Sequence, residues 1–465
     1  WAHNMSNPNI LRQAARRFGL RYVLSEMYQQ AGQEQMRLFG APPSLTNEGS
    51  KYWKEAGVKY VYMVGRGEPW VIDPQAVEKS LEALDQQLTR AGKEMWAISA
   101  SDEVIHRARL EGAKLMADPP QDYAYIHQAD EEVRTQFGGG QWGIPHGEKD
   151  TNPYRWIAFN KWLSAKFHER AKRIRAVVNK HDSNIKLVSF DPQARVSGDN
   201  YSAIAGDYDI FTHQVNQSPG QWRADAGFYT KFLADLTGKD VWPCVHVENY
   251  AFATTPAEAR EELSQVFRNG GSGFHFYLPD TANGNKLVGD TRLSYFGSPR
   301  RYNTILNIVN LTRTMPKLRY PTDARTAILF NDDTLQSTFN GSRVPANSTM
   351  ACYTFLGPVV RSWFRFIDNN QVLSAASLRQ QFDTIYLPSA TYQRPEIVAK
   401  LRAFVEQGGT LVCGDASAFE TDTLGNDTSE QRRQLFGVKT GKKSSPKTLT
   451  ARLNDNEYSL PVSSA

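Results

Sequence analysis

Residues 95–103 read MWAISASDE, a short apolar run that ends in a pair of acidic residues. A run of this length, bounded by polar residues, is typical of a buried β-strand. Six further runs along the chain have the same character. They are residues 21–28 (RYVLSEMY), 59–65 (KYVYMVG), 185–191 (IKLVSFD), 209–215 (DIFTHQV), 241–250 (VWPCVHVENY) and 273–280 (GFHFYLPD).

Amphipathic segments with apolar residues at helical spacing separate these runs. Such segments cover residues 75–92, 160–180, 224–238 and 256–269. Gly92 and Gly238 each precede the next strand, where glycine commonly ends a helix. Strands that alternate with helices predict a parallel sheet with crossover helices.

Seven such strands need an eighth to close a (β/α)8 barrel. Residues 1–8 (WAHNMSNP) predict a loop that leads into a helix at residues 9–18, so we expect the first strand at or before residue 1. In that barrel, residues 95–103 form strand four and residues 241–250 form strand seven.

The pattern changes after about residue 320. Residues 325–331, 382–388 and 410–414 predict strands, and residues 395–407 predict a helix. These elements indicate a small doubly wound α/β domain. We therefore expect a barrel at residues 1–320, an α/β domain at residues 321–436, and the start of a further β segment at residues 437–465.

Composition excludes several classes of function. The formal charge of +5 comes from 54 basic and 49 acidic residues spread along the chain, which argues against nucleic-acid binding. The sequence contains no apolar run near the length of about 18 residues that spans a membrane. The chain starts without methionine and stops in mid-pattern, so we expect a mature or truncated piece of a longer protein. Sequons at Asn340 and Asn347 are compatible with secretion, and we favour an extracellular or periplasmic location.

The sequence predicts neither a metal site nor an organic cofactor. Cys244, Cys352 and Cys413 lie far apart and match no metal or disulfide spacing, so we expect buried thiols. His146, Glu148 and Asp150 alternate within a polar loop, a pattern that arises by chance and predicts no metal.

Glu103 and Glu248 each end an apolar run and precede a loop. In a (β/α)8 barrel, reactive side chains project from the carboxyl ends of the strands. Retaining hydrolysis of a glycoside needs two carboxyl groups about 5 to 5.5 Å apart, one protonated and one ionised. Strands four and seven lie on opposite sides of the mouth, so their tips can flank one scissile bond.

Residues 96–103 (WAISASDE) and 242–250 (WPCVHVENY) resemble the clan of retaining glycosidases whose acid/base follows strand four and whose nucleophile follows strand seven. Residues 382–415 resemble the amidotransferase-like domain that follows the barrel in family 42 β-galactosidases. The resemblance implies Glu103 as acid/base, Glu248 as nucleophile, and cleavage of a β-linked carbohydrate, with β-galactosidase as the candidate activity. It also implies a homo-oligomer, a trimer, built in part by the trailing flavodoxin-like domain.

Other residues are candidates for contacts with the sugar. Asp102 stands where many clan members place asparagine, and it would raise the pKa of Glu103 or bind a hydroxyl. Glu26 and Glu68, near the ends of strands two and three, are candidates for hydroxyl binding or plain surface carboxylates. Tyr277, at the end of strand eight, is a candidate platform for the sugar ring.

Two histidines and one tryptophan are further candidates for contacts with the sugar. His213 ends strand six, and either contacts the sugar or is a hydrogen-bonded strand-end histidine. His246 precedes Glu248 by two residues and shares its face of the strand, or packs inside the barrel. Residues 118–156 predict a long loop after strand four, whose glycines and Trp142 could cover a bound sugar.

Two other functions stay open. The chain could be a non-catalytic carbohydrate-binding or structural protein that kept the barrel, because one fold hosts many functions. It could also use Cys413 of the trailing domain in an amidotransferase-like reaction, although the sequence has no nucleophile-elbow motif.

Overall fold

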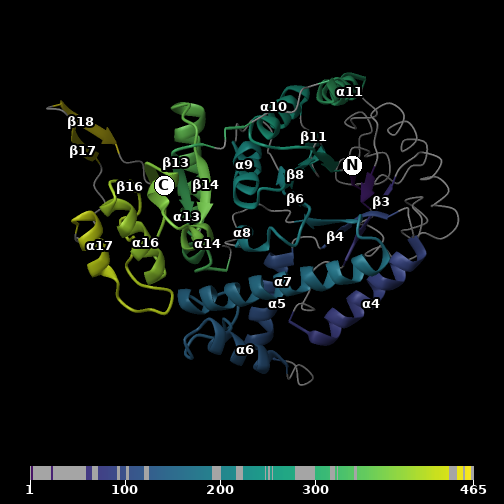
Figure 1. Cartoon of the computed structure of the whole chain (residues 1–465), viewed down its shortest axis with the longest axis horizontal. Helices are drawn as coiled ribbons and strands as arrows, with labels where there is room; N and C mark the ends of the chain where they lie inside the picture. Colours follow the sequence, from purple (N-terminus) through teal and green to yellow (C-terminus); the bar gives the residue numbers. More distant parts are fainter. Residues whose placement is uncertain are drawn as a thin grey trace.

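The computed structural model (Figure 1) gives the arrangement of most of the chain. It describes residues 2–3, 22–24, 59–64, 72–91, 95–100, 104–119, 125–190, 200–215, 224–246, 248–249, 252–253, 255–277, 299–314, 320–321, 323–339, 343–438, 448–453 and 456–461.

The first sheet is a closed ring of parallel strands. Its segments are β1 (Ala2–His3), β2 (Tyr22–Leu24), β3 (Lys59–Met63), β4 (Met95–Ser99), β5 (Lys186–Phe190), β6 (Ile210–Thr212), β7 (Gln214–Val215), β8 (Asp240–Val241), β9 (Cys244–His246) and β12 (His275–Tyr277). Strands six and seven are each split in two, and β6 pairs with β8 while β7 pairs with β9. The order β7-β9-β12-β1-β2-β3-β4-β5-β6-β8 therefore returns to its start. The predicted (β/α)8 barrel is confirmed.

The ring is completed by a strand of two residues. Ala2 pairs with Phe276 of β12 on one side and with Val23 of β2 on the other. The strand predicted at or before residue 1 therefore lies slightly later, at residues 2–3 of the predicted loop, and residues 4–8 of that loop lie outside the described residues. A strand this short has no alternation of apolar and polar residues to reveal it.

Strand seven is also shorter than predicted. Pro243 separates β8 from β9, and proline has no N–H to donate to a neighbouring strand. Beyond β9, β10 (Glu248–Asn249) pairs antiparallel with β11 (Phe252–Ala253) and leaves the ring. Residues 241–250 are thus three segments and not one continuous strand.

Helices follow the strands around the outside of the ring. They are α4 (Pro74–Ala91), α5 (Val104–Ala117), α6 (Tyr125–Gln136), α7 (Pro153–His181), α8 (Tyr201–Ile204), α9 (Asp225–Thr237), α10 (Pro256–Arg268) and α11 (Pro299–Thr314). The predicted helices at residues 75–92, 160–180, 224–238 and 256–269 are confirmed as α4, α7, α9 and α10, whereas the helix predicted at residues 9–18 lies outside the described residues. Local chemistry sets their ends: Thr255 and Glu258 form a capping box on α10, and Gly238 ends α9 at a φ of 63°.

The elements from β13 onward form a unit that follows the barrel, which we call the trailing unit. It contains a second parallel sheet, in the order β14-β13-β15-β16. Its strands are β13 (Thr326–Phe330), β14 (Arg365–Asp368), β15 (Thr384–Leu387) and β16 (Thr410–Cys413). The helical segments are α12 (Asp332–Leu335), α13 (Arg343–Thr354), the π-helical turn η5 (Phe355–Val359), α14 (Asn369–Ser374), α15 (Leu378–Gln381), α16 (Pro395–Glu406) and α17 (Ser429–Phe436). A hairpin of β17 (Thr448–Leu453) and β18 (Asn456–Pro461) follows.

The two sheets share one hydrophobic core, because the barrel helix α9 also covers a face of the second sheet (Figure 1). The ring centroid of Phe232 on α9 lies 4.7 Å from that of Phe330 on β13 and 5.4 Å from that of Phe366 on β14. Asp235 on α9 accepts a 2.9 Å hydrogen bond from the backbone N–H of Phe366. The opposite face of the sheet packs against α14, α15 and α16 in a separate cluster. Within the described part of the chain, no helix is both long and apolar enough to cross a membrane.

The shared core predicts that the barrel and the trailing unit unfold together. Replacement of Phe232, which is 2% exposed, by alanine is expected to lower the free energy of unfolding by about 3–5 kcal/mol through cavity formation. Urea unfolding followed by fluorescence should still show one transition. Leu311→Ala, at a residue 59% exposed, is the control and should change stability by less than about 0.5 kcal/mol. Two transitions, of which Phe232→Ala shifts one alone, would contradict the shared core.

Candidate active site

The interior of the barrel shows how strands four and seven lie relative to each other. The indole rings of Trp96 on β4 and Trp242, which follows β8, are stacked with centroids 5.4 Å apart and planes 17° apart. They pack with Val61, Ala97, Val188 and Ile210, which come from β3, β4, β5 and β6. This cluster contains strand residues and no described helix residue, so it fills the inside of the ring. Strands four and seven therefore approach each other across the barrel.

Alternation along the strands separates the two faces of the ring. Ile98, Phe211 and Val241 belong to the outer cluster, together with Leu84 of α4 and Phe232 of α9. Their neighbours Ala97, Ile210 and Trp242 face inward. Successive side chains of a regular strand point to opposite faces. In β4 the register against β3 shifts, because Tyr60 pairs with Met95 and Val61 pairs with Ala97. Trp96 is the extra residue at this irregularity, which is why it joins the inner cluster together with its neighbour Ala97.

Both candidate glutamates follow these strands in the sequence. Glu248 is the first residue of β10, two residues after β9 ends at His246, and its backbone pairs with Ala253. Glu103 lies four residues after the end of β4 and one before α5 begins, and it falls outside the described residues together with Asp102. Parallel strands present their carboxyl ends on one side of the ring, where (β/α)8 barrels carry their active sites. The separation of the two carboxyl groups stays a prediction.

Strand eight of the barrel, β12, brings two of the predicted sugar-binding residues side by side. Tyr277 is the last residue of β12, and its Cα partner across the pairing is His246 of β9. The structure describes the backbone of both residues, so their contacts with a sugar stay predictions. Glu26 and Glu68 lie outside the described residues.

His213 does not face the mouth of the barrel, and its predicted role at the sugar is corrected. The side chain is fully buried, and its Nε2 lies 2.9 Å from the hydroxyl of Thr230 on α9. Because Thr230 donates its own proton to the carbonyl of Ala226, His213 is the donor in this contact. Burial lowers the pKa of His213 to about 3, so the ring is neutral at ordinary pH. Ile210 faces into the barrel, so alternation along the strand turns His213, three residues later, outward. Of the two interpretations, the hydrogen-bonded strand-end histidine is correct.

The long loop predicted at residues 118–156 was wrong in part, because it contains helix α6. The buried residues of α6, among them Ile126, Ala129 and Val133, form a narrow stripe on a mostly polar helix, which is a weak sequence signal. The covering role of Trp142 is also corrected. Its indole N–H donates to the carbonyl of Leu424 at 3.0 Å, and its ring stacks on Tyr154. Trp142 therefore joins the barrel to the trailing unit.

The polar loop that contains His146 and Asp150 has a local structural role. Asp150 accepts hydrogen bonds from the backbone N–H groups of His146 and Asn152 and from the guanidinium of Arg155. The described residues contain no cluster of three metal-ligating side chains.

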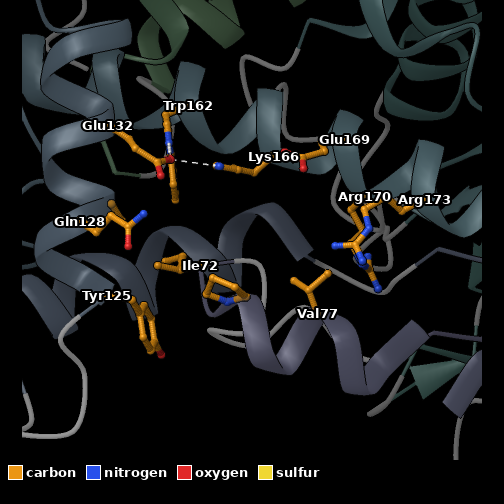
Figure 2. A pocket seen from close by; sticks show the side chains of 12 residues that line it. Ile72, Val77, Tyr125, Gln128, Glu132, Trp162, Lys166, Glu169, Arg170 and Arg173 are labelled. Atoms are coloured by element: carbon orange, nitrogen blue, oxygen red, sulfur yellow. Dashed lines mark hydrogen bonds and ion pairs between the residues drawn. The ribbon is translucent and has the colours of Figure 1, made fainter. Parts of the chain in front are cut away.

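A cavity of about 120 Å³ lies outside the ring, between α4, α6 and α7 (Figure 2). Most of its charged groups have partners within the protein: Lys166 pairs with Glu132 at 3.0 Å, and Arg173 pairs with Glu78 at 2.6 Å. Ligand pockets typically enclose roughly 300–1,000 Å³, so we do not place the substrate here.

Arg170, at one end of this cavity, was missed by the sequence analysis. It is 4% exposed and donates a 2.6 Å hydrogen bond to the carbonyl of Val64, the residue after β3. Burial lowers the pKa of Arg170 to about 9. Arg170 interrupts the buried apolar stripe of α7 that includes Phe167, Ala171 and Ile174, and this interruption is the signal that could have identified it. It fixes the end of the strand that precedes Glu68.

Comparison with known proteins identifies the fold. No family model matches the chain, and no curated protein matches it in sequence. Among solved structures, a catalytic mutant of Gan42B, a GH42 β-galactosidase from G. stearothermophilus, matches with a TM-score of 0.69 and 13% identity over 99% of this chain and 79% of its own. The β-galactosidase from the psychrophilic Marinomonas ef1 gives 0.63 and 12% over 96% and 80%. The GH42 exo-carrageenase from Bacteroides ovatus gives 0.54 and 10% over 96% and 73%. The predicted likeness to family 42 is thus confirmed for the fold.

The buried state of His213 predicts a pH dependence of stability. The folded pKa of about 3 lies below the ordinary value of 6.5, so the unfolded chain takes up the proton first. Stability from this site is complete above pH 6.5 and falls as the pH drops toward 3, by on the order of 5 kcal/mol over the whole range. His213→Gln should therefore lose less stability than the wild type between pH 7.5 and 5 in urea unfolding. His127→Gln, at an exposed position on α6, is the control. Parallel losses in wild type and His213→Gln would contradict the assignment.

Proposed function

We propose that this chain is a retaining glycoside hydrolase that cleaves a β-linked carbohydrate, with Glu103 as acid/base and Glu248 as nucleophile. One observation carries the proposal: strands four and seven of a closed barrel meet across its interior through Trp96 and Trp242. Each strand leads in the sequence to one of the two glutamates, at the end of the barrel where such folds carry their chemistry.

The proposed reaction is a double displacement. The carboxylate of Glu248 attacks the anomeric carbon while the carboxylic acid of Glu103 gives its proton to the departing glycosidic oxygen. Water then attacks the glycosyl ester, Glu103 takes a proton from that water, and Glu248 leaves as a carboxylate. Two inversions at one carbon retain its configuration.

We propose a β-galactoside as the substrate, because Gan42B and the Marinomonas enzyme are β-galactosidases and share this fold. Contacts with the sugar are assigned to Asp102, Glu26, Glu68, His246 and Tyr277. The pairing of Tyr277 with His246 in adjacent strands supports a common role for these two residues.

The domain limits and the assembly are part of the same proposal. We assign a catalytic barrel to residues 1–320, a flavodoxin-like, amidotransferase-like domain to residues 321–436, and the start of a β segment to residues 437–465. The parallel order β14-β13-β15-β16 supports the flavodoxin-like assignment, because it is the order of the first four strands of that fold. A homotrimer and an extracellular or periplasmic location complete the proposal.

Two variants test the roles of the glutamates. Glu248→Gln is expected to abolish turnover of aryl β-galactosides, because no glycosyl ester can form. Glu103→Gln should lower kcat/KM for a poor leaving group by roughly 10²–10⁴-fold, the usual contribution of general acid catalysis. The exposed Glu261→Gln on α10 is the control and should retain activity.

Covalent labelling separates this proposal from a non-catalytic carbohydrate-binding barrel. A 2-deoxy-2-fluoro-β-galactosyl fluoride should label Glu248, which peptide mass spectrometry detects. A wild-type protein that hydrolyses no aryl β-glycoside of a broad panel and carries no label on Glu248 would support the non-catalytic alternative.

Cys413 tests the amidotransferase-like alternative. Burial raises the pKa of its thiol to about 11, and the thiol lies 3.6 Å from the carbonyl of Asp415. A thiol nucleophile reacts as the thiolate, so this environment disfavours catalysis by Cys413. We expect no glutaminase activity in the wild type and unchanged glycosidase activity in Cys413→Ser. Glutaminase activity that Cys413→Ser removes would reverse this conclusion.

A further inference from the structure

Helix α5 connects the proposed acid/base to the rest of the protein. It begins at Val104, the residue after Glu103, so its position fixes one end of the segment that carries this glutamate. Two buried contacts hold α5 on α7. A Cβ added to Gly112 would lie 2.4 Å from Cζ of Phe159, so the two helices approach closely there. Arg109 Nε donates a 2.5 Å hydrogen bond to Oδ1 of Asn160.

Asn160 also binds the trailing unit. Its side-chain amide donates a 2.8 Å hydrogen bond to the carbonyl of Gln336, the residue after α12. Arg109 is 2% exposed and Asn160 is fully buried. One amide group therefore bridges α5 and the residue after α12, with its oxygen bound to Arg109 and its nitrogen to Gln336. Loss of either hydrogen bond would remove a buried polar contact, at a cost of about 1–3 kcal/mol.

The neighbouring residue forms an ion pair with the same unit. Lys161 Nζ lies 2.7 Å from Oδ1 of the fully buried Asp333 on α12. Arg394 Nε, after β15, lies 2.9 Å from Oδ2 of the same carboxylate, and the amide of Asn369 after β14 donates to it at 3.2 Å. Burial alone would raise the pKa of Asp333, but Lys161 and Arg394 hold it below its ordinary value. Asp333 is thus an ionised, rigidly held acceptor for a lysine of the barrel.

The ion pair of Lys161 with Asp333 lies beyond the carboxyl ends of the strands of the second sheet. Asp333, Asn369 and Arg394 follow the carboxyl ends of β13, β14 and β15. In doubly wound sheets these ends form the crevice that binds a ligand, at the point where the strand order reverses. Here Lys161 from α7 reaches into that region. The surface that serves ligand binding in other doubly wound sheets is used to hold a helix of the barrel.

We propose that the trailing unit positions the acid/base of the barrel through Asn160 and Lys161. Gln336 and Asp333 fix these two residues of α7, Asn160 fixes Arg109 on α5, and α5 fixes the segment that ends in Glu103. Asn160 and Lys161 are positioning residues: Asn160 acts on α5 through Arg109, and Lys161 acts through α7, which carries Asn160. The proposal rests on the function proposed above.

Leaving-group dependence distinguishes positioning of the acid from general support of the fold. A poor leaving group such as phenolate needs the proton of Glu103 to depart, whereas 2,4-dinitrophenolate departs without it. A displaced acid therefore lowers kcat/KM for the phenyl glycoside selectively. A structural defect that reduces the amount of active protein lowers kcat/KM for both substrates equally.

The test uses the full chain and the variant Asn160→Leu, which keeps the number and branching of the side-chain heavy atoms and removes both hydrogen bonds. We expect kcat/KM for phenyl β-galactoside to fall roughly 10- to 100-fold, because small displacements of a catalytic group have effects of this size. For 2,4-dinitrophenyl β-galactoside the loss should stay within about threefold. Arg173→Met, on the same helix but in a solvent-exposed pair with Glu78, is the control and should change neither value.

Lys161→Met provides a second variant in case Asn160→Leu does not fold. Its side chain is 16% exposed, and we expect the same selective loss at a smaller magnitude. An equal loss on both substrates in the folded variants, or no loss on either, would overturn the positioning role while the proposed function stands. A wild type inactive on both glycosides would overturn the proposed function and this inference with it.

Discussion

Closure of the ring between β1 and β12 is the constraint on which the rest of the structure depends. A parallel strand at an open edge exposes unpaired N–H and C=O groups, and the two residues of β1 remove that edge by pairing on both sides. Closure is also what brings strands four and seven opposite each other, with Trp96 stacked on Trp242 inside the barrel. In a flat sheet of the same order, strands four and seven would lie three positions apart with parallel side chains, whereas the curvature of the ring turns their side chains toward each other.

The trailing unit is built onto this ring and not merely linked to it. Helix α9 covers the barrel with one side and the second sheet with the other, so Phe232 belongs to both. On another flank, Asn160 and Lys161 of α7 bind the carboxyl ends of the second sheet. The hydrogen bond between Trp142 and Leu424 adds a third contact. These contacts hold the unit to the barrel helices at several places, and the proposed positioning of Glu103 uses the one through Asn160 and α5.

The alternation of strands and helices was readable from the sequence because apolar periodicity is a local signal. The roles of single side chains were less accessible. His213 could have been placed correctly, because residues three apart on a strand point to opposite faces and Ile210 points into the barrel. Trp142 could not, because its partner Leu424 is 282 residues away and no local pattern encodes that contact. Strand β14 and helix α6 were missed because their short or polar sequences lack a clear period.

The separation of the carboxyl groups of Glu103 and Glu248 in a crystal structure tests the central claim most directly. A double-displacement mechanism predicts about 5 to 5.5 Å between them, close enough for one anomeric carbon to meet both groups. A separation of roughly 6.5–9.5 Å would indicate an inverting enzyme, and one well above 10 Å would show that the two glutamates do not share a site.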